Sequence, residues 1–462
     1  MLKDLLAHTP VYEIIGPRRI DIKGIALEPS DIKEGYLYIY SPDNVTNSYE
    51  EAIDEAIKRG ATAICIGKQD EALPRPVTYV KAYNYVRFLS AVSRNFFHNP
   101  SQSMQLVGIT GSHGKTTVGW MIKSILNVAG IPCVMVGTSF GQIGDHSFVS
   151  YHGPMNPLDM NSLLHNAVKE KVHWGIIECT YTGIVNEKFR HVWFDSIVYT
   201  DLYTYFKNQQ ADYHYFEIRK ALIDHLKIIN SPVIVNIDDF YTSEIEHSML
   251  VGYGLYGNCD VTAREIELLP NGSKLLLVTN KGSRSITLKV PGIHNVYNAL
   301  AAAAWGIAHK VDFESIIKGI ENFKGIPNIE SEIHAPERVT IDYIEPAEIS
   351  QLEEMYNSVK DVSKDKIATI LCIDDNFDEQ TFREIKPVLI ENSGLCTITC
   401  DYLSSRNKME KVVPIYLEEL KDLEVKCDVD HYKALQKVIA RLKDGGHILI
   451  VSVKRYNVSE KE

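Results

Sequence analysis

The residues with the clearest chemical use lie together at positions 108–117, which read GITGSHGKTT. This stretch follows the apolar run 104–107 and precedes a helical pattern over 118–128. A strand, a glycine-rich turn and a helix N-terminus form a phosphate cradle, because backbone N–H groups point at the anion and the helix dipole favours negative charge. We expect Lys115 to reach the β- and γ-phosphates of a nucleotide and the Thr116 hydroxyl to hold Mg²⁺.

The stretch departs from the pattern G-x-x-x-x-G-K-[ST] at one position, since Ile109 stands where that pattern has glycine. The alternative is a glycine-rich turn before an ordinary helix. The strand before the turn and the helix after it favour phosphate binding. The nucleotide contacts predicted from this loop are Gly111, Ser112, His113, Gly114, Lys115, Thr116 and Thr117.

Carboxylates stand at the ends of two predicted strands further along the chain. Glu178 ends the buried-type strand 174–178, and Asp201 ends the strand 196–201. Ligands of open α/β sheets gather at the carboxyl ends of the strands. We therefore expect Glu178 and Asp201 to meet the phosphate loop in one site.

The elements that must position these residues divide the chain into three parts. Residues 102–326 alternate strands with helices, which is typical of a mostly parallel sheet. Residues 1–101 read as a smaller α/β unit, and residues 327–462 alternate again as in a doubly wound domain. The predicted fold class is α/β in three domains: a small α/β N-terminal domain, a central parallel sheet of the P-loop ATPase type and a C-terminal Rossmann-like domain.

Composition excludes several classes of function. The 462 residues suggest roughly two to four domains, and the formal charge of −12 argues against general nucleic-acid binding. The N-terminus has no long apolar segment, and no run of about 18 apolar residues occurs, so we expect no signal peptide and no membrane span. The eight cysteines lack C-x-x-C pairs, which favours reduced thiols in a cytoplasmic protein over a zinc site at Cys396 and Cys400.

Six motifs in a fixed order resemble those of the Mur ligases, and most closely the UDP-N-acetylmuramoyl-tripeptide synthetase (MurE) type. The resemblance is strong in the middle of the chain and weak in both flanks. The family's T-G-T-N-G-K-T-T resembles residues 110–117, and its strand ending in glutamate resembles residues 176–178. Its T-N-L, N-x-D-D, G-x-[FH]-N-x-x-N-A and V-D-Y segments resemble residues 200–202, 236–239, 292–299 and 341–343.

The resemblance implies an ATP-dependent reaction that forms an amide bond. ATP phosphorylates a carboxylate to an acyl phosphate, an amine attacks, and ADP and phosphate leave. The cofactors implied are ATP and Mg²⁺, and the partners are a small-molecule carboxylate and an amino acid or amine. Because Mur-type ligases commonly act as monomers, we expect a monomer or a weak homodimer.

The resemblance also assigns roles to residues outside the loop. Thr116 and Glu178 would hold a first Mg²⁺. The family's carbamylated lysine falls on Lys220, which would hold a second Mg²⁺; the alternative is an ordinary solvated lysine. Lys115, Glu178 and Lys220 are thus the predicted catalytic residues. Further ATP contacts are implied for His294, Asn295, Asn298 and, from the third domain, Asp342.

The motifs that read the family's substrates are altered here. Glu28-Pro29-Ser30 stands in place of D-S-R, and Pro327-Asn328-Ile329 stands in place of the P-G-R hinge. We therefore hypothesise a MurE-like ligase with a non-standard substrate. The alternatives are a slow or impaired ligase, a non-catalytic nucleotide-binding homologue and, less consistent with the motifs, a nucleotide-driven switch. The predicted substrate contacts are Asn156, Thr180, Asp201, Arg406 and Lys454.

Overall fold

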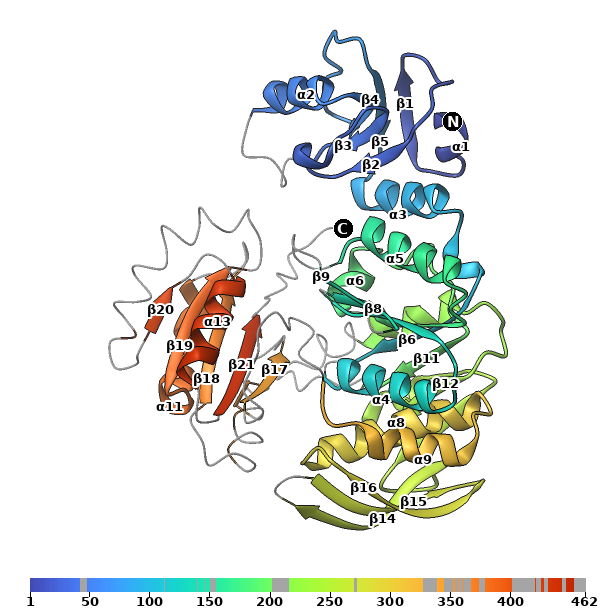
Figure 1. The fold of residues 1–462 in the computed structure, drawn as a ribbon, viewed down its shortest axis with the longest axis vertical. Helices are drawn as coiled ribbons and strands as arrows, with labels where there is room; N and C mark the ends of the chain where they lie inside the picture. Colours follow the sequence, from blue (N-terminus) through green and yellow to red (C-terminus); the bar gives the residue numbers. More distant parts are fainter. Residues whose placement is uncertain are drawn as a thin grey trace.

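The computed structural model contains three β-sheets of five, eleven and five strands. Figure 1 shows them as separate units, coloured blue, green to yellow, and orange to red. The described residues are 1–41, 48–111, 113–138, 140–144, 146–149, 155–201, 216–269, 272–326, 339–344, 352–353, 356, 360, 367–373, 379–400, 420, 425–427, 431–442 and 446–452.

The N-terminal sheet has the order β1-β5-β4-β3-β2. Only β1 runs antiparallel to its neighbour; the other pairs are parallel. Helix α2 begins with a capping box, in which Ser48 and Glu51 each bond the other's backbone N–H, and this arrangement satisfies two of the donors that a helix start leaves unpaired. The elements are α1 (Leu2–Leu5), β1 (Val11–Ile15), β2 (Gly24–Ala26), η1 (Pro29–Asp31), β3 (Tyr36–Ile39), α2 (Tyr49–Lys58), β4 (Ala61–Gly67), β5 (Thr78–Ala82) and α3 (Tyr85–Phe96).

The central sheet has the order β16-β15-β14-β13-β12-β11-β6-β10-β7-β8-β9. The run from β14 to β7 is parallel, and both margins are antiparallel. The strands are β6 (Gln105–Thr110), β7 (Cys133–Val136), β8 (Phe140–Ile143), β9 (His146–Val149), β10 (Trp174–Glu178), β11 (Ser196–Tyr199), β12 (Val233–Asn236), β13 (Leu250–Gly254), β14 (Val261–Leu269), β15 (Gly272–Thr279) and β16 (Gly282–Leu288).

Strand β6 lies between β10 and β11, and this order brings the predicted site together. In register, Ile109 is opposite Glu178 on one side, and Thr110 is opposite Tyr199 on the other. Because all three strands are parallel, their carboxyl ends open at the same edge of the sheet. The phosphate loop after β6 is therefore flanked by the residues that end β10 and follow β11.

Helices cover both faces of this sheet. On one face α4 (Lys115–Val128), α8 (Ile293–Ala308) and α9 (Phe313–Asn322) share a hydrophobic core with Val107 and Ile109. On the other face α5 (Pro157–Lys169) packs with Leu106 and Ile177. Alternate residues of one strand thus face opposite cores, as the pleat requires. The alanines of α8 at 301–304 are fully buried, so this helix packs through small residues.

The C-terminal sheet is parallel throughout, with the order β17-β21-β18-β19-β20. Its elements are β17 (Val339–Ile344), β18 (Ile367–Ile373), α11 (Glu379–Asn392), β19 (Leu395–Cys400), β20 (Val425–Cys427), α13 (His431–Arg441) and β21 (Gly446–Ser452). Strands that alternate with helices in a parallel sheet are a doubly wound arrangement. The three sheets confirm the predicted α/β class.

Helix α3 joins the N-terminal sheet to the central domain. Arg87 of α3 donates two hydrogen bonds to Glu187 of the central domain, Nε–Oε2 at 2.7 Å and Nη2–Oε1 at 2.6 Å. Arg190, which also belongs to the central domain, bonds the same carboxylate at 2.9 Å. Leu158 of α5 packs on the core of the N-terminal sheet. Two independent contacts, one charged and one apolar, therefore hold the first unit against the second.

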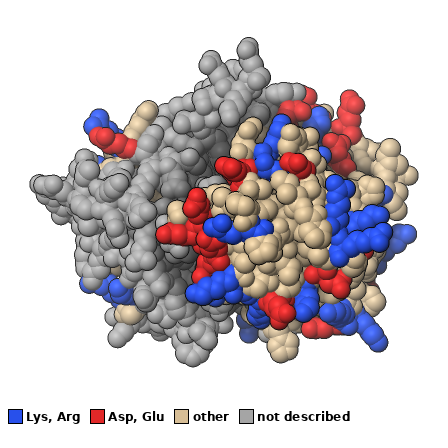
Figure 2. All heavy atoms as spheres, turned by 90° about the horizontal axis from the view of Figure 1, so that it is seen from above, with Lys and Arg blue, Asp and Glu red and all other residues tan. Residues whose placement is uncertain are grey.

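The described surface mixes both signs of charge. In the face that Figure 2 shows, acidic and basic side chains are interspersed rather than gathered by sign. None of the described helices is both long enough and apolar enough to cross a membrane.

The contact between α4 and α9 provides a test of the packing. A Cβ on Gly319 would lie 2.4 Å from the Cα of Ile125, so Gly319→Ala must move a helix backbone. The better helix propensity of alanine stabilises the folded protein by about 1 kcal/mol, whereas overpacking destabilises it by about 1–3 kcal/mol. We expect a net loss of stability and a Tm lower by several degrees, with Lys318→Ala at an exposed position of α9 as the neutral control. A Gly319→Ala protein as stable as the wild type would contradict this packing.

Candidate active site

The loop between β6 and α4 has a backbone that only glycine permits at two positions. Gly111 has φ +151° and Gly114 has φ +76°. A Cβ on Gly111 would lie 1.9 Å from Thr200 Oγ1, and a Cβ on Gly114 would lie 2.3 Å from Asn298 Oδ1. The two glycines therefore let the loop turn and let two neighbouring elements approach it closely.

Residues after β11 fix the shape of this loop. Thr200 Oγ1 lies 3.2 Å from the carbonyl oxygen of Thr110 and 2.6 Å from that of His113. The backbone N–H of His113 donates to Asp201 Oδ2 at 3.0 Å. Lys115, the first residue of α4, donates from Nζ to the Gly111 carbonyl at 2.8 Å. The loop closes on itself and on β11, so its remaining N–H groups are held in place at the N-terminus of α4.

Glu178 lies at the carboxyl end of β10 and is 3% exposed. Its Oε2 accepts a hydrogen bond from Thr138 Oγ1 at 3.2 Å, and its Oε1 makes no hydrogen bond with the described residues. Burial raises the pKa of Glu178, and the charge of Lys115 together with the hydroxyls of Thr116 and Thr138 opposes that rise. The charge of the predicted phosphate-binding lysine thus acts on the predicted metal ligand.

The start of α8 completes this side of the site. Gly292 caps the helix at φ +92°, and a Cβ there would lie 2.5 Å from the His294 ring, so that ring folds back over the glycine. Asn295 Nδ2 donates to the Pro291 carbonyl at 2.7 Å, and Asn298 Nδ2 donates to Asn295 Oδ1 at 3.2 Å. Through Asn298 this network touches Gly114, which places the predicted adenine-side residues beside the phosphate loop.

Lys220 ends a helical segment at 216–220 and caps the short helix η4 (Ala221–His225). Its Nζ lies 3.7 Å from Glu217 Oε1 and 5.2 Å from the centre of the Phe216 ring. An ammonium fits this setting, because it pairs with the carboxylate and with the ring face. A carbamate on Lys220 would meet the Glu217 carboxylate as a like charge and would need one of the two to turn away.

Three predicted substrate residues take part in local hydrogen bonds. Asn156 caps α5 by accepting from the N–H groups of Leu158 and Asp159 at 2.8 and 3.0 Å. Thr180 Oγ1 accepts from the Gly183 N–H at 3.1 Å beside α6 (Tyr181–Val185). Asp201 holds the phosphate loop as described above, so its position beside the loop is clear and its contact with substrate stays a prediction.

Some predicted residues lie outside the described part of the chain. Ser112, Arg406 and Lys454 are among them. Asp342 is described in backbone only, within β17 opposite Leu449 of β21. The predicted roles of these four residues stay predictions.

Sequence reasoning missed several side chains of this site. Arg219 is 2% exposed and lies 3.3 Å from Asp201 through Nη1 and Oδ1; only its position next to Lys220 could have drawn attention to it. Lys188 lies near Glu178, Cys179 and Asp159. Burial lowers the pKa of Lys188 to about 8, although electrostatic interactions with these three groups oppose the shift. Nothing in the sequence around Lys188, which lies in a loop after a helix, indicates that it belongs to the site.

The residues present fit a magnesium ion that is also held by nucleotide phosphates. Among the described residues no group of three or more His, Cys, Asp or Glu side chains could hold a metal on its own. Mg²⁺ in nucleotide sites commonly takes one or two protein carboxylates plus phosphate oxygens. The unbonded, buried Oε1 of Glu178 is a donor atom of the required kind.

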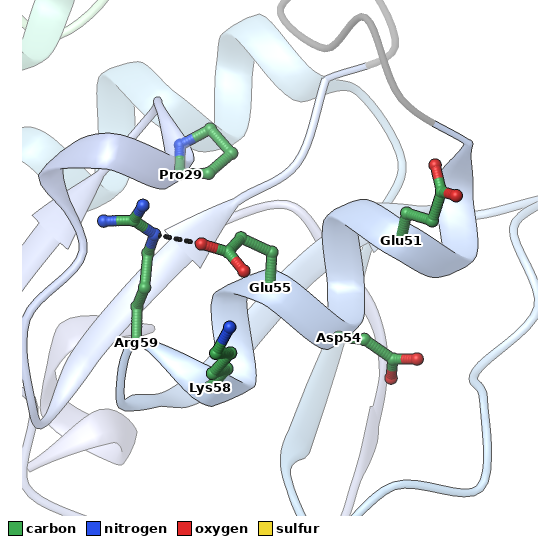
Figure 3. Close-up of a pocket in the computed structure, with 6 residues that line it drawn as sticks. All are labelled: Pro29, Glu51, Asp54, Glu55, Lys58 and Arg59. Carbon is green, nitrogen blue, oxygen red and sulfur yellow. Dashed lines mark hydrogen bonds and ion pairs between the residues drawn. The ribbon is translucent and has the colours of Figure 1, made fainter.

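A hollow lies on the N-terminal domain, over α2 and η1 (Figure 3). Arg59 Nε pairs with Glu55 Oε1 at 2.6 Å, and Arg75 Nε pairs with Asp54 Oδ1 at 2.6 Å. Three carboxylates and two cations line the hollow, which makes it a poor anion site. The lining residues are Pro29, Glu51, Asp54, Glu55, Lys58 and Arg59.

Comparison with known proteins agrees with this geometry. Residues 109–306 match the Mur ligase middle domain. The chain is 26% identical to the UDP-N-acetylmuramoyl-L-alanyl-D-glutamate--2,6-diaminopimelate ligase of Alkaliphilus metalliredigens, over 97% of this chain and 92% of that protein. MurF from Acinetobacter baumannii has a similar fold, with a TM-score of 0.62 at 17% identity over 98% of this chain and 95% of that chain. The MurF ligase of Thermotoga maritima, solved in complex with ADP, has a TM-score of 0.54 at 15% identity over 93% of this chain and 94% of that chain.

A phosphate loop after one parallel strand, with a buried carboxylate at the end of the neighbouring strand, is an arrangement typical of a nucleotide-dependent α/β enzyme. The chain belongs to the Mur ligase family. It is an ATP-dependent amino-acid ligase of the MurE-like type, as the motifs predict.

The geometry at Gly114 predicts a loss of nucleotide binding in Gly114→Ala. Both the positive φ and the contact with Asn298 oppose a Cβ there. Gly130, just beyond the other end of α4, has nearly the same φ of +71° but no atom within 4 Å of a Cβ. We expect Gly114→Ala to weaken ATP binding at least tenfold in an equilibrium titration and Gly130→Ala to leave it unchanged. Equal effects of the two substitutions would show that strain alone, without the Asn298 contact, accounts for the loss.

Burial of Glu178 predicts a pH-dependent gain of stability in Glu178→Gln. Because the folded-state pKa is raised, the stability that this group contributes is present below the ordinary carboxyl pKa and is lost as the pH rises through the folded-state value. Glu178→Gln should therefore have a higher Tm than the wild type at about pH 8, with the difference shrinking towards about pH 4. With Mg²⁺ and ATP present, the wild type should gain more in Tm than the variant does.

Glu187→Gln is the control of opposite sign. Burial raises the pKa of Glu187, but the bonds from Arg87 and Arg190 outweigh it, so the net pKa is lowered. This substitution should lower the Tm at neutral pH, with the loss fading as the pH falls. A lower Tm at neutral pH in both variants would contradict the account of Glu178 as a buried charge whose desolvation outweighs its favourable contacts.

Proposed function

We propose that this ligase joins a carboxylate to an amino acid or amine through an acyl phosphate, and that its acid differs from the UDP-N-acetylmuramoyl-L-alanyl-D-glutamate named for its relatives. The amine is of the class that includes 2,6-diaminopimelate, which those relatives add. The observation that carries the ligase is that buried Glu178 ends the strand beside β6, whose loop leads to Lys115, and that the charge of Lys115 acts on this carboxylate.

The residues of the loop would serve phosphoryl transfer by positioning and neutralising charge. Such a transfer depends mainly on these two effects, with little covalent work for the protein. The N–H groups at the start of α4 and the Lys115 ammonium would hold the phosphates of ATP. The γ-phosphoryl group would pass to an oxygen of the substrate carboxylate, and ADP would leave. The amine would then form the C–N bond, lose a proton and displace phosphate.

Thr116 and Glu178 would hold Mg²⁺, which would neutralise phosphate charge when bound. The unbonded Oε1 of Glu178 supports this assignment. Lys220, if carbamylated, would offer a carboxylate for a second Mg²⁺, and Glu217 would then have to leave its present position 3.7 Å from Nζ. Asp342 would reach the nucleotide from the third domain, and Arg406 and Lys454 would meet the amino-acid substrate.

Two features of the N-terminal and central domains support a non-standard acid. The hollow beside Pro29 is lined by three carboxylates and two cations, and its Arg59 is already paired with Glu55. A diphosphate would gain little there, since charge-assisted bonds need donors that are not already occupied. In the central domain the side chains of Asn156 and Thr180 are bonded to backbone N–H groups, which restricts what they offer a substrate. The domain roles proposed are substrate binding for 1–101, ATP binding for 102–326 and amino-acid binding for 327–462.

Phosphate release from ATP tests this function. Purified protein with Mg²⁺ would be supplied with pairs of acids and amines, one pair being UDP-N-acetylmuramoyl-L-alanyl-D-glutamate with diaminopimelate or lysine. We expect release that needs both partners of another pair, with amide product in equal amount by mass spectrometry, and loss of both in Lys115→Ala. Release with the muramoyl pair alone would show that the acid is the one its relatives use. Tight ATP binding without turnover on any pair would favour a non-catalytic homologue.

A further inference from the structure

Asp201 places a negative charge at the mouth of a loop that must receive anions. Its Oδ2 accepts the His113 N–H at 3.0 Å, and the His113 ring nitrogen Nδ1 lies 3.8 Å from the same oxygen. The side chain of Asp201 is 23% exposed. The resembling T-N-L segment of the family has asparagine here, which would accept the same bond without a charge. This chain therefore carries one additional negative charge beside its phosphates.

Arg219 lies directly behind that carboxylate. Its Nη1 is 3.3 Å from Asp201 Oδ1, and with 2% exposure it is among the largest fully buried side chains of the described chain. Its backbone carbonyl accepts a hydrogen bond from the buried Tyr199 hydroxyl at 3.0 Å, which fixes the arginine to the end of β11. A buried guanidinium is stable only with a partner of opposite charge, and Asp201 is such a partner.

The position of the pair makes it relevant to binding as well as to folding. Asp201 bonds a backbone N–H of the phosphate loop on one side and Arg219 on the other. Charges a few ångströms apart in a partly buried site interact far more strongly than in water. An unneutralised Asp201 would repel the phosphates of ATP, whereas a neutralised one holds the loop and repels them little.

We infer that Arg219 is a positioning residue that neutralises Asp201 at the phosphate loop, so that the two form a compensating pair which sets the affinity for nucleotide phosphates. The inference rests on the nucleotide site proposed above. Where the family's T-N-L segment has a neutral asparagine, this chain has an aspartate that is paired with a buried arginine. Because Arg219 precedes Lys220, the pair also fixes the end of the helical segment that carries the predicted carbamylation site.

A double-mutant cycle tests the pair. The variants are R219M, D201N and D201N/R219M, and the control is R284M, which removes an exposed arginine paired with Glu314 far along the sheet. ATP and ADP affinities with Mg²⁺ would be measured by equilibrium titration, and thermal unfolding would confirm that each protein is folded. R219Q, which keeps polar contacts without the charge, serves as the single variant if R219M does not fold.

We expect R219M to weaken ATP binding by at least about tenfold and ADP binding by less, since ATP carries more charge near the loop. D201N should weaken ATP binding less than R219M does, because the amide oxygen can still accept the His113 N–H although Arg219 loses its charged partner. The ATP affinity of D201N/R219M should lie within about threefold of that of the wild type. In the double variant two uncharged side chains replace an aspartate and an arginine whose charges cancel. R284M should not change either affinity.

Two results would overturn the inference. If D201N/R219M binds ATP as weakly as R219M does, Arg219 acts independently of Asp201. If R219M binds ATP as the wild type does, the arginine has no effect on the phosphates. In both cases the wild type still binds ATP, and the proposed function stands. A wild type that binds no ATP would instead remove the nucleotide site and this inference with it.

Discussion

The site depends on a loop whose backbone hydrogen-bonding groups must be left for a ligand while its shape is held by other parts of the fold. Backbone N–H groups that already donate hydrogen bonds within the loop are not available to bind phosphate. Here neighbouring residues maintain most of the shape: the Thr200 hydroxyl contacts the carbonyls of Thr110 and His113, and Asn298 lies against Gly114. One contact within the loop, from Lys115 Nζ to the Gly111 carbonyl, adds to them. Gly111 and Gly114 are required because the neighbouring residues approach this closely. The order of the strands, with β6 between β10 and β11, makes the approach possible.

The same order explains the balance of charge in the site. Glu178 and Asp201 end or follow the strands beside β6, so both carboxylates face the loop. The two carboxylates differ in their burial and in their hydrogen-bond partners. Glu178 is buried with an unbonded oxygen and a raised pKa, which suits a metal ligand. Asp201 is paired with Arg219 and bonded to the loop, which suits a structural anchor. Burial alone is costly for a carboxylate, and the difference between the two sites lies in what offsets that cost.

The part of the fold that sequence predicts best is the part where local pattern and chemistry coincide. The strand, loop and helix at 105–128 read directly from apolar runs and glycines, and the Ala-rich helix α8 reads from its small residues. The hairpin of β8 and β9 at the sheet margin was not predicted, although the two residues between its strands, Gly144 and Asp145, form a pair typical of hairpin turns. Each strand has only four residues, which is too short for a clear alternating pattern. Arg219 and Lys188 could not be found from sequence, since the groups around them come from chain segments distant in sequence. Cross-strand proximity, as between Glu178 and the loop, could be predicted from topology alone, whereas the contact of Asn298 with Gly114 required coordinates.

Hydrogen–deuterium exchange with and without Mg²⁺ and ATP tests the central claim most directly, because it reports on the backbone N–H groups that the loop is built to present. Slowed exchange is predicted for the peptides over 111–117, 176–180 and 292–299, with little change in the N-terminal hollow at 50–59. The same peptides should show no slowing in a protein with Lys115→Ala. Protection confined to other segments, or binding without protection of the loop, would contradict the account of how this fold holds a nucleotide.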